Sequence, residues 1–330
     1  MRADLRDPRL GLFILAVAFL AATFVAPRIE VEHGGYDLLA IIDITGSMNV
    51  RDYSADGKAI SRLEKVKAAL RAFVIGLPCP SRVALGVFTE RRPFLLFEPI
   101  DSCADFPPLE AAIAAIDWRM AWEGDSRISA GLFRAIDMAR ELKTDLLFFT
   151  DGQEAPPLPA SGGPVFEAKP GETRGLIVGT GGYDLSPIPK FDDRGRETGF
   201  VTVDEVPHES RFGLPPSGAD EREGFNARNA PFGATAAVGV EHLSSVKEDY
   251  LRALSENTGL GYLRLDDEAR LLDAYRTAGT AHARAVMLDL RPLLGVSATA
   301  CLFAAYAITP LLEQRGRRRR IRKQHGGSIK

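Results

Sequence analysis

The stretch Ile41-Ile42-Asp43-Ile44-Thr45-Gly46-Ser47-Met48 ends a hydrophobic run with one acid and two hydroxyls at alternate positions. The run starts at Tyr36, and segment 36–44 (YDLLAIIDI) is apolar on both faces, which is typical of a parallel strand covered by helices. A turn at Gly46 brings the two hydroxyls to the side of the carboxylate, and such hard oxygens suit Mg²⁺, Mn²⁺ or Ca²⁺. The stretch alone also fits a strand-end aspartate followed by a Ser/Thr turn, so the choice depends on the rest of the chain.

Strand and helix patterns alternate along the middle of the chain, which predicts a doubly wound α/β fold with a mostly parallel sheet. Further strands are expected over 81–88, 94–100, 145–150, 175–178 and 262–265, and helices over 61–77, 107–116, 128–142, 246–258 and 268–278. Strands 81–88 and 94–100 are expected to pair as an antiparallel hairpin. Segment 181–245 is rich in Pro, Gly and charge, and we interpret it as an insertion with a small hairpin near Asp192.

Two uncharged segments, 10–26 and 293–312, are near the length of about 20 residues that crosses a membrane. Arginines precede the first, and a run of arginines follows the second, which favours cytoplasmic ends at 1–9 and 313–330. The domain over 36–279 is then periplasmic, anchored in the inner membrane of a Gram-negative bacterium. Two alternatives remain, a cleaved signal peptide for the first segment and a buried core helix for the second.

Charge is distributed unevenly over the 330 residues, whose net charge is −3. Because the C-terminal tail is strongly basic, the region between the two apolar segments is acidic, and an acidic domain binds nucleic acid poorly. A basic run directly after a membrane span usually contacts anionic lipid. We therefore expect the membrane, and no nucleic acid, among the partners.

Three cysteines are present, and Cys301 lies within the second apolar segment. Cys79 and Cys103 flank the predicted hairpin and fall opposite one another, a spacing that permits a disulfide. An oxidising periplasm would allow that bond, whereas two unrelated buried thiols are the alternative.

Three polar loops follow or precede strands and helices where an open α/β sheet binds its ligands, beyond the carboxyl ends of the strands. The first follows the strand that ends near Ile44, the second precedes the helix at 128–142, and the third follows the strand at 145–150. Together the loops predict a metal site made of Asp43, Thr45, Ser47, Ser126 and Asp151.

These loops resemble the metal-ion-dependent adhesion site of the von Willebrand factor A (vWA) domain family. The matching motifs are DITGS (43–47), SRISAGL (126–132) and TDG (150–152), in the family's order. Thr45 stands where serine is usual and Ser126 where threonine is usual, and both exchanges keep the hydroxyl. The resemblance implies a vWA fold, which is Rossmann-like, over Tyr36 to about Gly279.

The resemblance also implies how the site works. The three hydroxyls would bind the ion directly and the two aspartates largely through water, so the ion would seek a carboxylate from a partner protein. Mg²⁺ is the expected ion, with Mn²⁺ and Ca²⁺ as alternatives. Met48, Trp122 and Glu123 are expected on the rim that contacts the partner.

Enzymatic activity is not expected, because a catalytic metal needs a general base beside it and none is obvious in the sequence. None of the five histidines has the spacing of a metal-ligand pair. An aspartic protease would need Asp-Thr-Gly, which Ile44 interrupts, and the loop 179–182 is not followed by a helix start. A metal-dependent hydrolase remains the less favoured alternative.

Segments 77–92, 117–125 and 189–197 look like MxaL-type proteins, membrane-anchored vWA proteins encoded with bacterial methanol dehydrogenase. This resemblance implies a role in maturation, calcium insertion or assembly of that periplasmic enzyme, with the dehydrogenase or its other accessory proteins as partners. Aerotolerance-type vWA scaffolds share the arrangement of span, vWA domain and span. Such a scaffold, working with an AAA+ ATPase, is the alternative.

Overall fold

The computed structural model describes residues 7–25, 28–120, 125–158, 162–192, 194–206, 240–312 and 314–315. The chain forms two compact units. One comprises residues 34–283, and the other combines residues 1–33 with 284–330.

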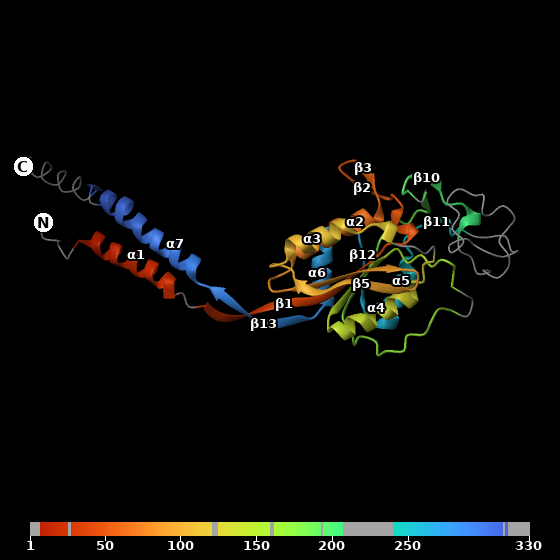
Figure 1. The fold of residues 1–330 in the computed structure, drawn as a ribbon, viewed down its shortest axis with the longest axis horizontal. Coiled ribbons are helices and arrows are strands. Elements are labelled where there is room, and N and C mark those ends of the chain that lie inside the picture. Colours follow the sequence, from red (N-terminus) through yellow and green to blue (C-terminus); the bar gives the residue numbers. More distant parts are fainter. Residues whose placement is uncertain are drawn as a thin grey trace, which may run out of the picture. The chain divides into compact units, whose positions relative to one another are not determined.

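A seven-stranded, mostly parallel sheet is the centre of the larger unit (Figure 1). Its order is β12 (Gly261–Arg264), β7 (Gly175–Gly179), β6 (Asp145–Thr150), β1 (Arg28–Asp43), β4 (Arg82–Thr89) and β5 (Arg92–Asp101), with β13 (Ala281–Asp289) paired to β1. Only β5 among the six ordered strands runs antiparallel to its neighbour, β4. The doubly wound α/β fold predicted from the sequence is therefore confirmed, and so is the hairpin of β4 and β5.

Helices cover both faces of this sheet (Figure 1). One face packs against α2 (Arg62–Gly76), α3 (Phe106–Ala115) and α6 (Glu268–Ala278), and the other against α4 (Ile128–Leu142) and α5 (Glu248–Thr258). Alternate residues of β1 enter the two cores, with Leu38 on one side and Leu39 on the other. Burial on both faces is the reason that this strand is apolar at consecutive positions.

Short elements surround the sheet. They are the 3₁₀ turns η1 (Gly46–Asn49), η2 (Trp118–Met120) and η3 (Val203–Glu205), and the strand pairs β2 (Tyr53–Ala55) with β3 (Lys58–Ile60), β8 (Ser186–Pro187) with β11 (Leu243–Ser244), and β9 (Pro189–Phe191) with β10 (Glu197–Phe200). The pairing of β9 with β10 is the small hairpin predicted near Asp192. Residues 207–239 of the insertion lie outside the described residues.

Two features of the sheet differ from the sequence prediction. β1 begins at Arg28 instead of Tyr36, and β13 was not predicted. Most residues of β13 and of the first part of β1 are exposed or only partly buried. Their pairing satisfies backbone hydrogen bonds without burying a regular apolar face, so the hydrophobic pattern that marks a strand is missing.

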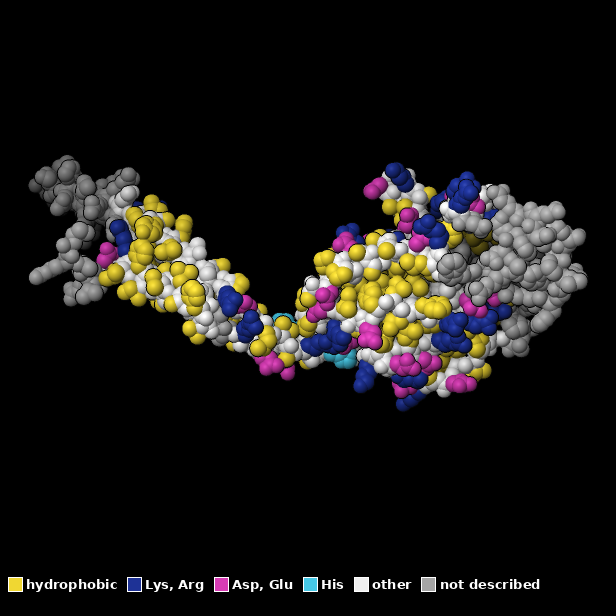
Figure 2. Space-filling model, viewed as in Figure 1, with side chains coloured by type: hydrophobic (Ala, Val, Ile, Leu, Met, Phe, Trp, Pro, Cys, Tyr) yellow, Lys and Arg dark blue, Asp and Glu magenta, His cyan; other side chains and the backbone are white. Residues whose placement is uncertain are grey.

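The smaller unit contains two helices that are long and apolar enough to cross a membrane, α1 (Pro8–Val25) and the continuous helix 291–312. The latter consists of α7 (Arg291–Phe303), the π-helical turn η5 (Ala304–Ile308) and one further turn. Apolar side chains lie on their surfaces (Figure 2), and the rings of Phe13 and Tyr306 contact each other at 5.4 Å between centroids. A core helix would bury such side chains, so these helices support association with a membrane.

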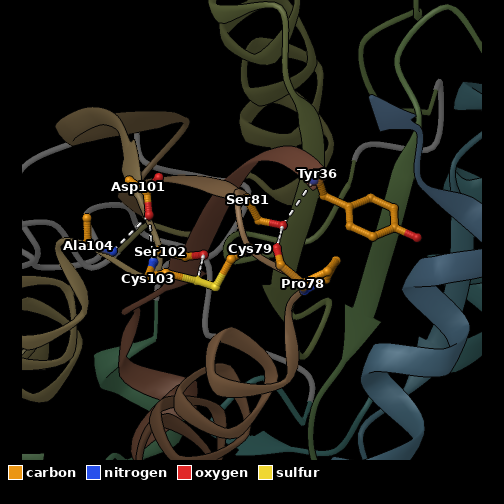
Figure 3. Close-up of a disulfide and its surroundings, with 8 residues drawn as sticks. All are labelled: Tyr36, Pro78, Cys79, Ser81, Asp101, Ser102, Cys103 and Ala104. Carbon is orange, nitrogen blue, oxygen red and sulfur yellow. Dashed lines mark hydrogen bonds between the residues drawn. A yellow bond between two sulfur atoms is a disulfide. The ribbon is translucent and has the colours of Figure 1, made fainter. Parts of the chain in front are cut away.

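A disulfide joins Cys79 and Cys103, as the hairpin spacing predicts, with their Cα atoms 6.0 Å apart (Figure 3). It closes the open end of the β4–β5 hairpin. The hydroxyl of Ser81, which follows this disulfide, accepts a hydrogen bond from the backbone N–H of Tyr36 and donates one to the carbonyl of Pro78 (Figure 3). The disulfide loop is thereby attached to the central strand β1.

Candidate metal site

The five predicted metal ligands all lie at the carboxyl edge of the sheet, and all are buried. Asp43 is the last residue of β1, and Asp151 directly follows β6, its parallel neighbour. Thr45 and Ser47 lie in or beside the turn η1, and Ser126 precedes α4. The parallel pairing of β1 with β6 is the reason that the two aspartates reach the same edge.

Neutral donors surround the carboxylate of Asp43. Thr45 donates to Oδ1 from its backbone N–H at 2.9 Å and from its hydroxyl at 2.7 Å. Thr150 donates from its hydroxyl to Oδ2 at 2.7 Å. These bonds hold Asp43 in one orientation. Because the hydroxyl of Thr45 donates its proton to Asp43, the oxygen lone pairs of that hydroxyl point away from Asp43.

Asp151 is held by a cation that the sequence analysis did not assign to the site. Its Oδ2 accepts hydrogen bonds from Nη1 of Arg62 at 2.6 Å and from Oγ of Ser244 at 3.1 Å. Arg62 is 0% exposed, and its Nη2 also contacts Oδ2 of Asp52 at 2.7 Å. Arg62 is the first residue of α2, and Ser61 and Glu64 on either side of it form a capping box. The sequence pattern predicts only this helix start. A cation in the first turn opposes the helix dipole, which is the one local signal that could have indicated another role.

Ser126 provides the observation that best fits a bound ion. Its backbone is held by Ala155, whose carbonyl accepts from the N–H of Ser126 at 2.7 Å and whose N–H donates back at 2.8 Å. Its buried Oγ has no hydrogen-bond partner among the described residues. Buried hydroxyls rarely lack a partner, so this oxygen fits a ligand supplied from outside the chain.

A cavity of about 280 Å³ is lined by the hydroxyl ligands Thr45, Ser47 and Ser126, which come from two of the three loops. The third loop contributes Gln153 and Ala155 to the lining, whereas Asp43 and Asp151 lie outside it. Hydroxyl and carboxylate oxygens of this kind suit Mg²⁺, Mn²⁺ or Ca²⁺, so the residues fit the expected ion. Within the part of the chain that the structure describes, no group of three or more His, Cys, Asp or Glu could hold a metal.

The insertion and η2 supply apolar residues to the lining of this cavity. Ile188, Pro189, Phe191 and Val201 from the insertion, together with Trp118 from η2, form its apolar wall. The rings of Trp118 and Phe191 stack with 4.4 Å between centroids. The cavity therefore combines neutral oxygen ligands with hydrophobic side chains.

The predicted rim is wrong for Met48. This residue is fully buried, and its sulfur accepts a hydrogen bond from the hydroxyl of Thr180 at 3.4 Å. The turn η1 directs the side chain of Met48 into the core instead of toward solvent. Trp122 and Glu123 lie outside the described residues.

Burial and a neighbouring charge change the acidity of the site. Burial raises the pKa of Asp43 to about 7, and the negative charge of Asp151 adds to this rise, against the lowering effect of the hydrogen bonds from Thr150 and Thr45. Burial alone would lower the pKa of Arg62, but Asp151 and Asp52 raise it above its ordinary value. Arg62 is therefore a permanent cation, whereas Asp43 takes up a proton when no ion is bound.

This acidity predicts how stability depends on pH in the ion-free protein. The folded chain holds a proton on Asp43 up to about pH 7, whereas the unfolded chain loses it near 3.8. Because the folded state binds more protons in this window, the free energy of unfolding falls as pH rises through it. We expect the melting temperature in EDTA to be higher at pH 5 than at pH 8.

Asp43→Asn should remove most of that difference, because asparagine is neutral at both pH values. In excess Mg²⁺ the stabilisation contributed by the ion should grow as pH rises past 7, since the ion requires the ionised carboxylate. Melting curves of both proteins at several pH values measure these effects. Identical pH dependence of the wild type and Asp43→Asn would contradict the assignment.

Comparison with known proteins places this site in a family of domains. Residues 38–153 match the family model of the von Willebrand factor type A domain. The match runs from β1 to the loop after β6 and includes all five predicted ligands. The chain therefore carries a vWA domain. No curated protein matches the chain in sequence.

Solved structures with a similar fold include membrane proteins. An aerotolerance-related membrane protein from Bacteroides fragilis is 15% identical, covers 74% of this chain and 98% of its own, and has a TM-score of 0.47. The conserved protein BatB from Bacteroides thetaiotaomicron is 15% identical, covers 73% and 97%, and has a TM-score of 0.46. A von Willebrand factor type A protein from Catenulispora acidiphila is 12% identical, covers 83% and 47%, and has a TM-score of 0.35.

Proposed function

We propose that this chain is a membrane-anchored binding protein whose vWA domain captures an acidic side chain of a partner protein through a divalent cation. The buried, unpartnered Oγ of Ser126 carries this proposal, because it shares a cavity with the hydroxyls of Thr45 and Ser47. The ion would be held by these three hydroxyls together with Asp43 and Asp151. Mg²⁺ is the expected ion.

The donor set explains why a carboxylate would be the preferred ligand. Three of the five ligands are neutral, and Arg62 compensates part of the charge of Asp151. A divalent cation in such a site keeps residual positive charge, which attracts an anionic side chain in a buried environment. The ion would contribute to partner binding through this attraction and through an open coordination position.

The cavity also indicates the surroundings of that carboxylate. Ile188, Phe191 and Trp118 belong to the apolar wall of the cavity that the hydroxyls also line, so an aliphatic or aromatic residue next to the acid would bury its side chain there. Glu205 and Glu241 also line the cavity, and Glu205 is paired with Lys190 at 2.5 Å. We propose that the partner presents one acid in an apolar sequence, since a strongly acidic segment would meet these glutamates.

A binding role is proposed in preference to a catalytic one. Glu205, one of the two glutamates that line the cavity, accepts from both Lys190 and the backbone N–H of Thr202. Burial raises the pKa of Glu205, but these bonds lower it below its ordinary value overall, and a carboxylate with a low pKa is a poor general base near neutral pH. The contacts therefore favour a structural role for Glu205 over that of a base.

The biological setting proposed first is an aerotolerance-type vWA scaffold. It is supported by the vWA match and by the two apolar helices outside the domain. The similar structures named above include an aerotolerance-related membrane protein. In this setting the vWA domain faces the periplasm, where the disulfide of Cys79 and Cys103 would be stable, and an AAA+ ATPase contacts the basic cytoplasmic tail.

Maturation of periplasmic methanol dehydrogenase is the second setting. The MxaL-like segments 77–92, 117–125 and 189–197 support it, and the last of these contributes Pro189, Lys190 and Phe191 to the cavity. Here the vWA domain would bind the dehydrogenase or another accessory protein during calcium insertion or assembly. The similar proteins named above do not point to methanol oxidation, so this setting ranks below the first.

Capture experiments with the purified full chain in detergent test both the binding mode and the setting. The partner retained from membrane and periplasmic extracts of the source cells should be released by EDTA and retained again after Mg²⁺ is added. Ser126→Ala should reduce the retained amount at least tenfold, because it removes one direct ligand, whereas Ser54→Ala on the exposed strand β2 should not.

The identity of the retained protein separates the settings. An AAA+ ATPase or another stress-related membrane protein supports the scaffold, and methanol dehydrogenase or its accessory proteins support the maturation role. Retention that persists in EDTA, or equal retention by Ser126→Ala, would reject the metal-dependent binding mode.

A further inference from the structure

We propose that Arg62 is a positioning residue that joins the metal ligand Asp151 to both ends of the insertion, so that ion binding and the placement of the insertion are linked. The proposal rests on the proposed function, because it concerns the same metal site. The proposal adds Arg62, which lies outside the three motifs, to the metal site. It also links ion binding to the position of the apolar wall that contacts the partner.

The guanidinium of Arg62 is shared among four residues, because its Nη1 also donates to the carbonyl of Ser47 at 3.5 Å. Nη1 donates to Oδ2 of Asp151 at 2.6 Å and to Oγ of Ser244 at 2.7 Å. Nη2 and Nε donate to Oδ2 of Asp52 at 2.7 and 3.0 Å, and Nη2 also donates to the carbonyl of Ser244 at 3.2 Å. A planar guanidinium places these donors in a fixed geometry, which the single ammonium of lysine cannot reproduce.

The same groups hold the start of the insertion. Asp52 accepts from the backbone N–H of Gly182 at 2.7 Å through Oδ2, the oxygen that also faces Arg62. The carbonyl of Gly182 in turn accepts from the N–H of Val246 at 2.9 Å, which closes the two ends of the insertion on each other. We call these paired ends, residues 181–182 and 244–246, the neck of the insertion.

Gly181 shows how closely the neck packs on the guanidinium. Its φ is +119°, a conformation that favours glycine, and a Cβ at this position would lie 2.7 Å from Nε of Arg62. Ser244, on the other side of the neck, bonds both Arg62 and Asp151. Arg62, Asp151 and the neck therefore form one buried hydrogen-bonded unit.

This unit connects the metal site to the apolar wall. Ile188 and Phe191 come soon after Gly182 in the chain. Both line the same cavity as the hydroxyl ligands. An ion that orders Asp151 would order the neck through Arg62 and Ser244. By thermodynamic reciprocity, a ligand that packs on the wall would then increase the affinity for the ion.

Two variants and one control test this linkage in the purified full chain. Arg62→Lys keeps the charge and loses the forked geometry, and Ser244→Ala removes one hydroxyl without changing charge. Arg71→Gln serves as the control, because Arg71 is on the same helix but pairs with Glu110 at the surface. The readouts are the Mn²⁺ affinity from titration calorimetry and the hydrogen exchange of the Gly182 and Val246 amides with and without Mn²⁺.

In the wild type and in Arg71→Gln, we expect Mn²⁺ to slow exchange at both neck amides by about tenfold, within the usual range for linked sites. Arg62→Lys should weaken Mn²⁺ binding by about tenfold, because substitution of residues that hydrogen-bond metal ligands commonly has an effect of this size. It should also remove the slowing of exchange at the neck. Ser244→Ala should change both readouts in the same direction. If Arg62→Lys does not fold, Ser244→Ala decides alone.

The outcomes separate this proposal from the proposed function. A wild-type protein that does not bind Mn²⁺ would reject the proposed function together with the linkage. A wild type that binds Mn²⁺ without any change at the neck, or variants that keep both the affinity and the slowing, would reject the linkage and leave the metal site intact.

Discussion

We expect Asp43→Ala to abolish the stabilisation that Mg²⁺ should give to the folded protein. In the wild type, an Mg²⁺ concentration of 100 times the dissociation constant should raise the free energy of unfolding by about 2.7 kcal/mol. The variant lacks the carboxylate that orients Thr45 through two hydrogen bonds, so the direct ligand is misplaced and the site loses charge. Thermal unfolding in Mg²⁺ and in EDTA measures the difference.

The design separates loss of the ion from loss of the fold. An ionised Asp43 is disfavoured by burial in the ion-free protein, so its removal is not expected to expose an unpaired charge. Asp137→Ala, which removes an exposed aspartate of α4 paired with Arg140, is the control and should keep the full ion effect. An Mg²⁺-dependent shift of normal size in Asp43→Ala would show that the ion binds elsewhere.

Arg62→Met should lower the free energy of unfolding by about 3–5 kcal/mol, because Asp151 and Asp52 lose a buried cationic partner. Methionine fills similar space without hydrogen bonds. Denaturant unfolding in EDTA measures this loss independently of the ion. Lys65→Met, which breaks an ion pair at the surface, should cost less than about 1 kcal/mol.

A second substitution checks the cause of that loss. In the double variant Arg62→Met with Asp151→Asn, the carboxylate left without its cation is neutral, so part of the stability should return. If Arg62→Met alone costs no more than Lys65→Met, the buried ion pairs have no net stabilising role and the network is held by packing.

Local patterns in the sequence account for most of the secondary structure. Segment 36–44 is apolar at consecutive positions because β1 is buried on both faces, and α4 spans Ile128–Leu142 as its periodicity predicts. The three motifs could be assigned to one site because parallel strands end at the same edge of a sheet. β13 could not be found in this way, since its exposed residues carry no burial pattern.

Contacts between distant segments account for the rest of the site. Arg62 meets Asp151 and Ser244, which are far from it in the chain, and a single arginine at a helix start carries no sign of its partners. Ile188, Phe191 and Val201 likewise line the same cavity as the hydroxyls, a proximity that no local pattern indicates. Met48 was misplaced on the rim for the same reason, as the direction of a turn depends on the core beneath it.

Local periodicity and spacing along the chain are sufficient to predict the vWA-type sheet, the two apolar helices, the cysteine pair and the oxygen-rich loops. The pairing of charges in the interior, the hydroxyl left without a partner among the described residues, and the apolar residues that share the cavity with the hydroxyl ligands all depend on tertiary contacts. Burial makes these contacts strong, since a charge removed from water must find its partner within the protein. That partner is selected by the packing of the whole domain, so it is not encoded in the neighbouring residues.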